Sequence, residues 1–255
     1  MRSISLLETA DFIYAEDTRK TNKLLSKFNI NKKSKSFHEH NEIKITPLII
    51  EQLNADFEIA IISDAGAPCI SDPGYFLSQE CIKNNIEFTV LPGPSSIINA
   101  LILSGLPSNA FSFKGFFPRK RNVQIEMMQS LSRLSETVVF FESAKRIKAT
   151  VSIFAEYLSL NRKIILCREM TKKYEETIRG SLQDLKAKIE NDEITLKGEF
   201  VIVVEGSEKN TFDLNFSNTI KELYLEHLPA KDAAKLISAL SNQNKREVYK
   251  WLIDK

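Results

Sequence analysis

The sequence contains no long hydrophobic run. Its longest apolar stretches, such as residues 59–62, are as long as a strand, whereas a membrane-spanning helix needs about 20 apolar residues. Residues 1–8 hold no apolar segment long enough for a signal peptide, so the pattern predicts a cytoplasmic protein. With 43% hydrophobic and 27% charged residues, the 255-residue chain lies outside the range of disordered proteins and can form two domains.

Cysteine pairs, charge excess and common nucleotide motifs are also absent. The three cysteines form no CxxC pair, which argues against a disulfide framework and a four-cysteine zinc site. His38 and His40 lie close together, but the third histidine, His227, belongs to a separate segment, so we expect no metal site. The net charge is only +2, so a nucleic-acid partner must be argued from local clusters. Neither G-x-x-x-x-G-K-[ST] nor G-x-G-x-x-G occurs, which disfavours the common nucleotide-binding enzyme classes.

Short apolar runs alternate with helix-length amphipathic segments up to residue 205, which is typical of an α/β fold with a mainly parallel sheet. The expected strands are residues 11–15, 57–62, 87–91, 110–115, 137–141, 163–167 and 200–204. The expected helices are residues 18–28, 41–55, 73–83, 96–103, 123–134, 144–158 and 182–190.

Helix breakers at residues 104–109 predict a domain boundary, and the pattern becomes all-helical after residue 213. We therefore expect α/β domains over residues 1–107 and 108–210 and a helical tail over 211–255. Within the tail, helices at 231–240 and 245–253 around a turn at 241–244 form a helix-turn-helix pattern. Its expected apolar contacts are Ala233, Ala234, Ile237, Leu240, Val248 and Leu252.

The most informative loop is residues 63–74, which connect an apolar strand to a helix. They hold two of the eight glycines and two of the eight prolines, which is dense for a simple connector. Ligands bind at the carboxyl ends of parallel strands, where Asp64 and Asp72 could accept hydrogen bonds from hydroxyl or ammonium groups. A purely structural alternative is that Asp72 caps a helix beginning at Pro73.

Two further loops follow predicted strands. Residues 91–96 could face the same crevice as residues 63–74, or Ser95 and Ser96 could serve only to cap the next helix. Residues 16–20 place two carboxylates and two cations at a helix start, where Asp17 is expected as the N-cap.

A third segment, residues 113–121, interleaves three aromatic residues with four cations, which suits phosphate contacts and base stacking. Phe113 should face the core, so that Lys114 and residues 119–121 face RNA. Glu142 stands at another strand end, where helix capping explains it as well as function does.

Together these segments resemble the tetrapyrrole-methylase superfamily, most closely its ribosomal RNA small-subunit methyltransferase I branch. The resemblance follows the chain in order through AEDTRKTNKLL (15–25), FHEHNE (37–42), SDAGAPCISDPG (63–74), LPGPSS (91–96), FKGFFPRK (113–120), FFESAKRI (140–147), CREMTKKYEE (167–176), KGEFVIVVEG (197–206) and AAKLISALSNQNKREVY (233–249). It implies two α/β domains of the tetrapyrrole-methylase type with a small helical extension. It also implies a homodimer that uses S-adenosylmethionine to methylate the ribose 2′-oxygen of a cytidine in 16S ribosomal RNA.

The resemblance also implies a role for individual residues. The residues implied to bind the cofactor are Asp64, Ala65, Gly66, Pro68, Ile70, Ser95, Ser96 and Gly198, with Glu142 as a further candidate. Those implied to hold RNA are Arg19, Lys114, Arg119 and Lys120, and the pattern of cations adds Arg121 to this set. As general base we rank Asp17 first, followed by Glu16 and Glu142.

Two alternatives remain open at this point. One is methylation of a tetrapyrrole macrocycle, against which the basic segment 113–121 and the helical tail argue. The other is a non-catalytic RNA-binding protein with a relic cofactor site. Members of the family normally begin with an extra strand and a loop rich in Pro, Gly and Asn that contributes to the cofactor pocket, whereas Met1 falls where their first helix already runs.

We therefore predict weak binding of S-adenosylmethionine by the chain as given, because loss of a central strand exposes backbone groups and removes a wall of the pocket. Isothermal titration should show tighter binding to a version extended at its N-terminus by such a strand and loop. Equal affinities for the two versions would contradict this prediction.

Overall fold

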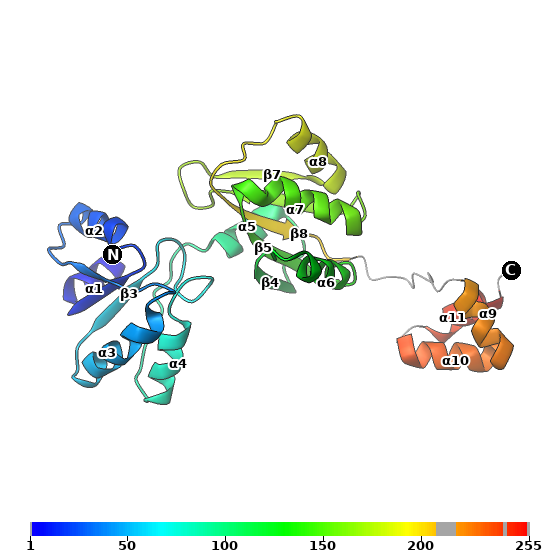
Figure 1. Cartoon of the computed structure of the whole chain (residues 1–255), viewed down its shortest axis with the longest axis horizontal. Helices are drawn as coiled ribbons and strands as arrows, with labels where there is room; N and C mark the ends of the chain where they lie inside the picture. The colour runs from blue at the N-terminus through cyan, green and yellow to red at the C-terminus, as the bar shows by residue number, and fades with distance from the viewer. Residues whose placement is uncertain (1, 208–217, 242–243, 254–255) are drawn as a thin grey trace. The chain divides into compact units, whose positions relative to one another are not determined.

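The computed structural model describes residues 2–207, 218–241 and 244–253. The chain divides into two compact units, Met1–Gly206 and Ser207–Lys255. The first unit contains a three-stranded and a five-stranded sheet, both covered by helices (Figure 1). This confirms the predicted α/β class, while the finer division of the first unit at residue 107 stays a prediction.

The smaller sheet is entirely parallel. Across it the strands are β2 (Ser34–Ser36), β1 (Phe12–Ala15) and β3 (Ile59–Ile62). The helices around it are α1 (Arg2–Thr9), α2 (Thr18–Lys27), α3 (Glu42–Asn54) and α4 (Tyr75–Lys83). Because side chains alternate along a strand, Ile13 packs toward α1 and α2 while Tyr14 packs toward α3 and α4. The sheet is thus the middle of three layers (Figure 1).

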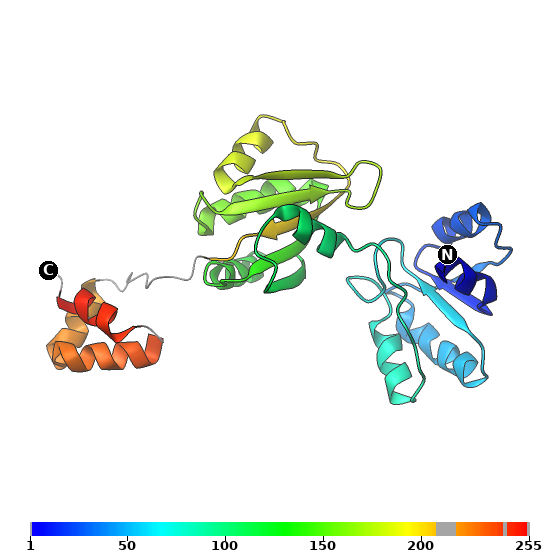
Figure 2. The ribbon, with the colours of Figure 1, turned by 180° about the vertical axis from the view of Figure 1, so that it is seen from behind.

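The strand predicted at residues 87–91 does not form, so that prediction is wrong. Residues 86–95 run as coil between α4 and α5 (Figure 2), and Phe88 and Val90 are 55% and 69% exposed. Among the described residues, β3 pairs only with β1, so no neighbouring strand is present for residues 87–91. Strand-forming composition does not suffice, because a strand is stable only when its backbone is paired.

The larger sheet departs from the expected mainly parallel arrangement. Its strands, in order across the sheet, are β4 (Phe111–Phe116), β5 (Thr137–Ser143), β8 (Glu199–Val204), β6 (Lys163–Arg168) and β7 (Glu176–Ser181). Only β4 and β5 are parallel; the other three pairs are antiparallel. The short connection from β6 to β7 explains one of them, because parallel neighbours need a crossover of a dozen or more residues.

Four helices enclose the larger sheet. They are α5 (Ser96–Ser104), α6 (Arg121–Leu131), α7 (Ala144–Tyr157) and α8 (Leu182–Glu190). Val138 and Phe140 of β5 pack in the core beneath α6, α7 and α8, whereas Val139 packs against α5 on the opposite face. Strand β8 is buried on both faces, as its unbroken apolar run predicts.

The tail unit is helical, as predicted. Its helices are α9 (Asn218–His227), α10 (Ala230–Ser241) and α11 (Lys245–Ile253). The buried core of this unit consists of Ala233, Ala234, Ile237, Val248 and Leu252, all of them predicted contacts. The side chain of Leu240 and turn residues 242–243 lie outside what the structure describes. No helix in the described parts of the chain is long and apolar enough to cross a membrane.

Candidate active site

The loops after β1 and β3 meet at one edge of the smaller sheet. Parallel pairing aligns Ala15 with Ile62, so both loops leave the sheet side by side. The backbone N–H of Asp17 donates to Asp64 Oδ1 at 3.2 Å, and the N–H of Asp64 donates to Glu16 Oε2 at 3.1 Å. Two segments 47 or 48 residues apart in sequence are thereby joined by reciprocal hydrogen bonds.

Asp17 caps α2, as the sequence predicts, and is also ion-paired. Its Oδ1 accepts the Arg19 backbone N–H at 2.9 Å, and its Oδ2 accepts Arg19 Nη2 at 2.8 Å. The hydrogen bond from the Arg19 side chain holds the pKa of Asp17 well below its usual range. The Arg19 side chain is 87% exposed, so a ligand phosphate can reach it. Asp17 is therefore ionised at neutral pH, and its basicity depends on what Arg19 contacts.

Lys20, the second cation of residues 16–20, is a member of this site to which the sequence assigned no role. Its Nζ lies 2.6 Å from Asp64 Oδ2, and this hydrogen bond raises the pKa of Lys20. The contact fixes the orientation of the Asp64 side chain, of which 22% is exposed. The two loops are thus joined by an ion pair as well as by backbone hydrogen bonds.

Asp72 has the electrostatics of a proton-transfer group. Burial, together with the nearby Glu16 carboxylate, raises the pKa of Asp72 to about 6, while a hydrogen bond from Ser63 opposes that shift. A carboxyl group with a pKa near neutrality is suited to general acid–base catalysis. Asp72 is not the cap of α4, because the helix begins at Tyr75 with Gly74 as its N-cap, so the capping interpretation is wrong.

A buried carboxylate on another helix takes over the capping of α4. Glu42 of α3 accepts the backbone N–H of Gly74 at 2.9 Å and that of Leu77 at 3.2 Å. Gly74 has φ +126°, a value that other residues rarely adopt, and a Cβ there would lie 3.0 Å from Cys69 Sγ. Glu42 therefore fixes the point at which residues 63–74 enter α4.

The middle of this loop presents small, exposed groups. Asp64, Ala65, Gly66 and Ala67 are exposed, as is Ile70, and Pro68 is half-buried. Gly66 has φ +79° and nothing within 4 Å of where a Cβ would stand. The backbone here is accessible to a ligand, with carboxylates beside it, which fits a cofactor that carries hydroxyl, ammonium and sulfonium groups.

The other predicted cofactor residues have structural roles of their own. Ser95 caps α5 by accepting the N–H of Ile98 at 3.3 Å, as predicted, and Ser96 begins the helix. Gly198 has φ +85°, and a Cβ there would lie 2.5 Å from Glu169 Oε1, so only glycine fits. Their contact with a cofactor stays a prediction.

The basic segment divides into buried and exposed members. Lys114, Arg119 and Lys120 are exposed, and the ring of Phe116 is 57% exposed. The sequence placed Arg121 with them, but its guanidinium is paired with Glu156 of α7. Phe113 faces the core against Phe141, as predicted, with ring centroids 4.8 Å apart.

Glu142, a candidate base, is buried with all of its acceptors engaged. Its Oε1 accepts the N–H of Ser143 at 2.8 Å, and its Oε2 accepts the Thr150 hydroxyl at 2.7 Å. Arg146 Nη2 lies 3.3 Å from the same Oε2, and the Glu142 side chain has no exposed surface. A reacting hydroxyl has no access to this carboxylate as it stands.

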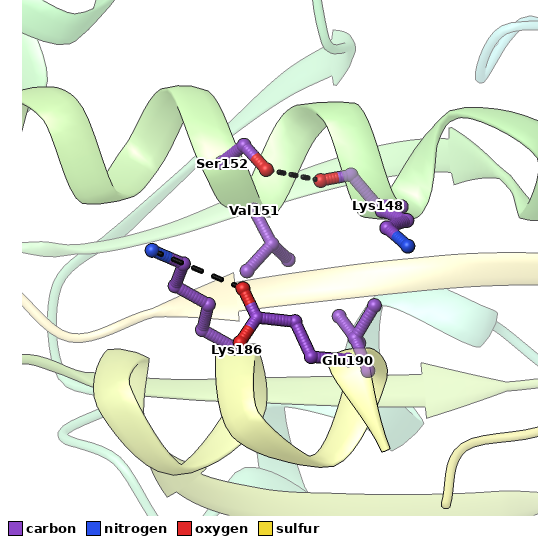
Figure 3. A pocket seen from close by; sticks show the side chains of 6 residues that line it. Lys148, Val151, Ser152, Lys186 and Glu190 are labelled. Atoms are coloured by element: carbon purple, nitrogen blue, oxygen red, sulfur yellow. Dashed lines mark hydrogen bonds and ion pairs between the residues drawn. The ribbon is translucent and has the colours of Figure 1, made fainter. Parts of the chain in front are cut away.

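A hollow between α7 and α8 lies apart from these residues (Figure 3). It is lined by Lys148, Val151, Ser152, Lys186, Ile189 and Glu190. About 20 Å³ of space holds roughly one water molecule. It cannot accept a nucleoside, so we do not place the site there. No group of three or more potential metal ligands occurs within the residues described.

Comparison with known proteins shows which family has this combination of an α/β unit and a helical tail. The family model for tetrapyrrole (corrin/porphyrin) methylases matches residues 1–186, and that for the RsmI C-terminal HTH domain matches residues 220–255. The curated ribosomal RNA small subunit methyltransferase I of Vibrio cholerae is 37% identical over 98% of this chain and 88% of that protein. The chain belongs to this branch of the tetrapyrrole methylases.

One further relative supports the assignment, and one solved structure supports the fold. The protein of the same name from Halalkalibacterium halodurans is 38% identical, with 97% of this chain and 87% of that protein covered. A Thermus thermophilus uroporphyrin-III C-methyltransferase structure, in complex with S-adenosyl homocysteine, matches with a TM-score of 0.52 at 14% identity. That match covers 80% of this chain and 89% of the other, and it shows the fold shared by this family member.

The raised pKa of Asp72 predicts a pH-dependent stability. The folded state holds the proton up to about pH 6, whereas the unfolded chain loses it near pH 4, so wild-type stability falls across this window as pH rises. Asp72→Asn should therefore be more stable than wild type at pH 7.5, by roughly 1 kcal/mol because solvent screens a half-exposed group. The gain should vanish near pH 4. Urea unfolding at both pH values measures it.

Asp184→Asn is the matched control, because the Ser181 hydrogen bond lowers the pKa of Asp184. That variant should be less stable than wild type at pH 7.5, and the difference should shrink only as pH falls below about 4. If Asp72→Asn showed no gain at pH 7.5, the assigned environment of Asp72 would be wrong.

Proposed function

We propose that this protein transfers a methyl group from S-adenosylmethionine to the ribose 2′-oxygen of a cytidine in the 16S ribosomal RNA of the small subunit. The main support is that residues 16–20 and 63–74 are joined by hydrogen bonds at one edge of the smaller sheet. The chain is also 37% identical to a ribosomal RNA small subunit methyltransferase. The implied homodimer is part of the same proposal.

The acidic loop edge is proposed to hold the cofactor, which supplies an electrophilic methyl group on a cationic sulfonium. The carboxylates of Glu16, Asp64 and Asp72 lie close enough that Glu16 and Asp64 both raise the pKa of Asp72. Such a negative field favours a cationic ligand. The exposed backbone from Asp64 to Ile70, together with Ser95, Ser96 and Gly198, would contact the rest of it.

The RNA would be held by exposed cations and one aromatic ring. Lys114, Arg119 and Lys120 offer phosphate contacts, and the half-exposed ring of Phe116 offers a stacking surface. Arg19 extends this set at the acidic edge. Its side chain is 87% exposed, so it can leave the ion pair with Asp17 and bind a phosphate instead.

Asp17 is proposed to take the proton of the reacting hydroxyl. While Arg19 is bound to Asp17, the carboxylate is a weak base. A backbone phosphate that draws Arg19 away restores the basicity of Asp17 at the moment RNA is present. Asp72, with its pKa of about 6, is the alternative base at the same edge, followed by Glu16.

The reaction is tested by incubating the protein with methyl-labelled S-adenosylmethionine and small ribosomal subunits. We expect label in the ribose 2′-oxygen of one cytidine, located by nuclease digestion and mass spectrometry. Label in an added tetrapyrrole, or RNA binding without any label, would contradict the proposal.

The base is tested by Asp17→Asn. Asparagine also caps helices, so α2 should persist, while turnover should fall about 10²- to 10⁴-fold because proton removal is lost. Affinity for the cofactor, measured by titration, should stay nearly constant. Asp72→Asn is the comparison variant; if it loses turnover and Asp17→Asn does not, Asp17 is not the base.

A further inference from the structure

We propose that Arg146 and Glu142 form a lock that positions the basic segment 114–120 for RNA, so that Glu142 is a positioning residue. This inference rests on the proposed function and adds to it two residues that act without touching the cofactor or the reacting atoms. The proposed reaction assigns no role to the ion pair between Arg146 and Glu142.

The lock grips the backbone just before the exposed cations Arg119 and Lys120. Arg146 Nη2 donates to the carbonyl of Phe117 at 2.8 Å and to that of Pro118 at 2.7 Å. These distances are shorter than the 3.3 Å to Glu142, so the main partners of this nitrogen are the two carbonyls. Both bonds come from one terminal guanidinium nitrogen, whose N–H groups point in fixed directions in the guanidinium plane.

Glu142 stabilises the arginine in that position. Its buried carboxylate is fixed by the Ser143 N–H and the Thr150 hydroxyl, and its charge offsets that of Arg146. The Arg146 side chain is only 25% exposed. A guanidinium neutralised in this way is a poor phosphate ligand, so its effect on RNA must come through the segment it holds.

Other contacts complete the anchoring of residues 117–118. The Phe117 N–H donates to the Phe141 carbonyl at 3.1 Å, and its ring is buried against Phe154, with centroids 5.2 Å apart. Gln124 Nε2 donates to the Pro118 carbonyl at 2.9 Å. The anchor lies between Phe116, the exposed ring, and Arg119, the first exposed cation.

The strand just before the anchor is irregular, so the segment needs such support. The pairing of β4 with β5 shifts register between Phe113 and Phe116, and Gly115 has φ +68°. A bulge of this kind redirects the side chains around it. Lys114 and Phe116 lie at this irregularity in the last residues of β4, and the lock sets the direction of the chain that follows.

A role of Glu142 through its charge and a role through positioning predict opposite changes in RNA affinity for Glu142→Gln. This change removes a negative charge near the basic segment, so charge alone would tighten RNA binding. Loss of position should instead raise the KM for small subunits about 10- to 100-fold, because contact groups are displaced by about 1 Å. In that case kcat at saturation and the affinity for S-adenosylmethionine should stay within about twofold of wild type.

Glu156→Gln is the matched control. It removes the same charge at the other end of the segment, where Glu156 pairs only with Arg121 among the described ion pairs, and it leaves both carbonyls untouched. We expect its KM to equal or fall below that of wild type. Equal KM values for Glu142→Gln, Glu156→Gln and wild type would overturn the proposal.

Arg146→Lys covers the case in which Glu142→Gln does not fold. A lysine keeps the charge, but its shorter side chain does not place a donor where Nη2 stands, so KM should rise as it does for Arg146→Met. If Arg146→Lys keeps wild-type KM while Arg146→Met does not, Arg146 acts through charge and the lock is refuted.

Hydrogen exchange without RNA separates failure of the lock from failure of the proposed function. Amides of residues 116–120 should exchange faster in Arg146→Lys than in wild type, with residues 163–168 unchanged. Unchanged exchange at 116–120 refutes the lock whatever the substrate is. If exchange at 116–120 is faster but the wild-type protein neither binds nor methylates small subunits, the lock exists but has no role in RNA binding.

Discussion

The parallel pairing of β1 with β3 is the constraint on which the candidate site depends. It places the ends of both strands at one edge, where the Asp17 N–H donates to the Asp64 carboxylate and the Asp64 N–H donates to the Glu16 carboxylate. Lys20 adds an ion pair to Asp64. Without this pairing the carboxylates would lie on unrelated loops, and the field that raises the pKa of Asp72 would be lost.

Both proposed functional segments are held by a buried carboxylate from outside the loop. Glu42 of α3 accepts N–H groups where residues 63–74 enter α4, and Glu142 of β5 orients the arginine that holds residues 117–118. In each case a buried group holds the backbone, so the exposed groups of the segment are free to contact a ligand. Rigid support of this kind keeps binding groups at their working geometry without ordering them on binding.

The sequence predicted most elements and the loops after β1 and β3, because apolar strands and capping residues are local signals. The sequence-based prediction was wrong where the presence of a neighbouring strand decides whether a segment forms a strand. Residues 87–91 have strand composition without a partner, whereas the polar residues 176–181 form an edge strand because β6 pairs with them. The role of Glu42 could not be predicted, because its partner Gly74 is 32 residues away. For Arg146 a signal existed: it stands four residues after Glu142, close enough in sequence for the two charges to pair across the turn from β5 into α7.

The joined loops are proposed to form the cofactor site. Hydrogen exchange measured with saturating S-adenosyl homocysteine tests it most directly, because each backbone amide reports its own protection. We expect slower exchange in residues 16–20 and 63–74 together. Protection confined to other parts of the chain, with both loops exchanging as in the free protein, would contradict it.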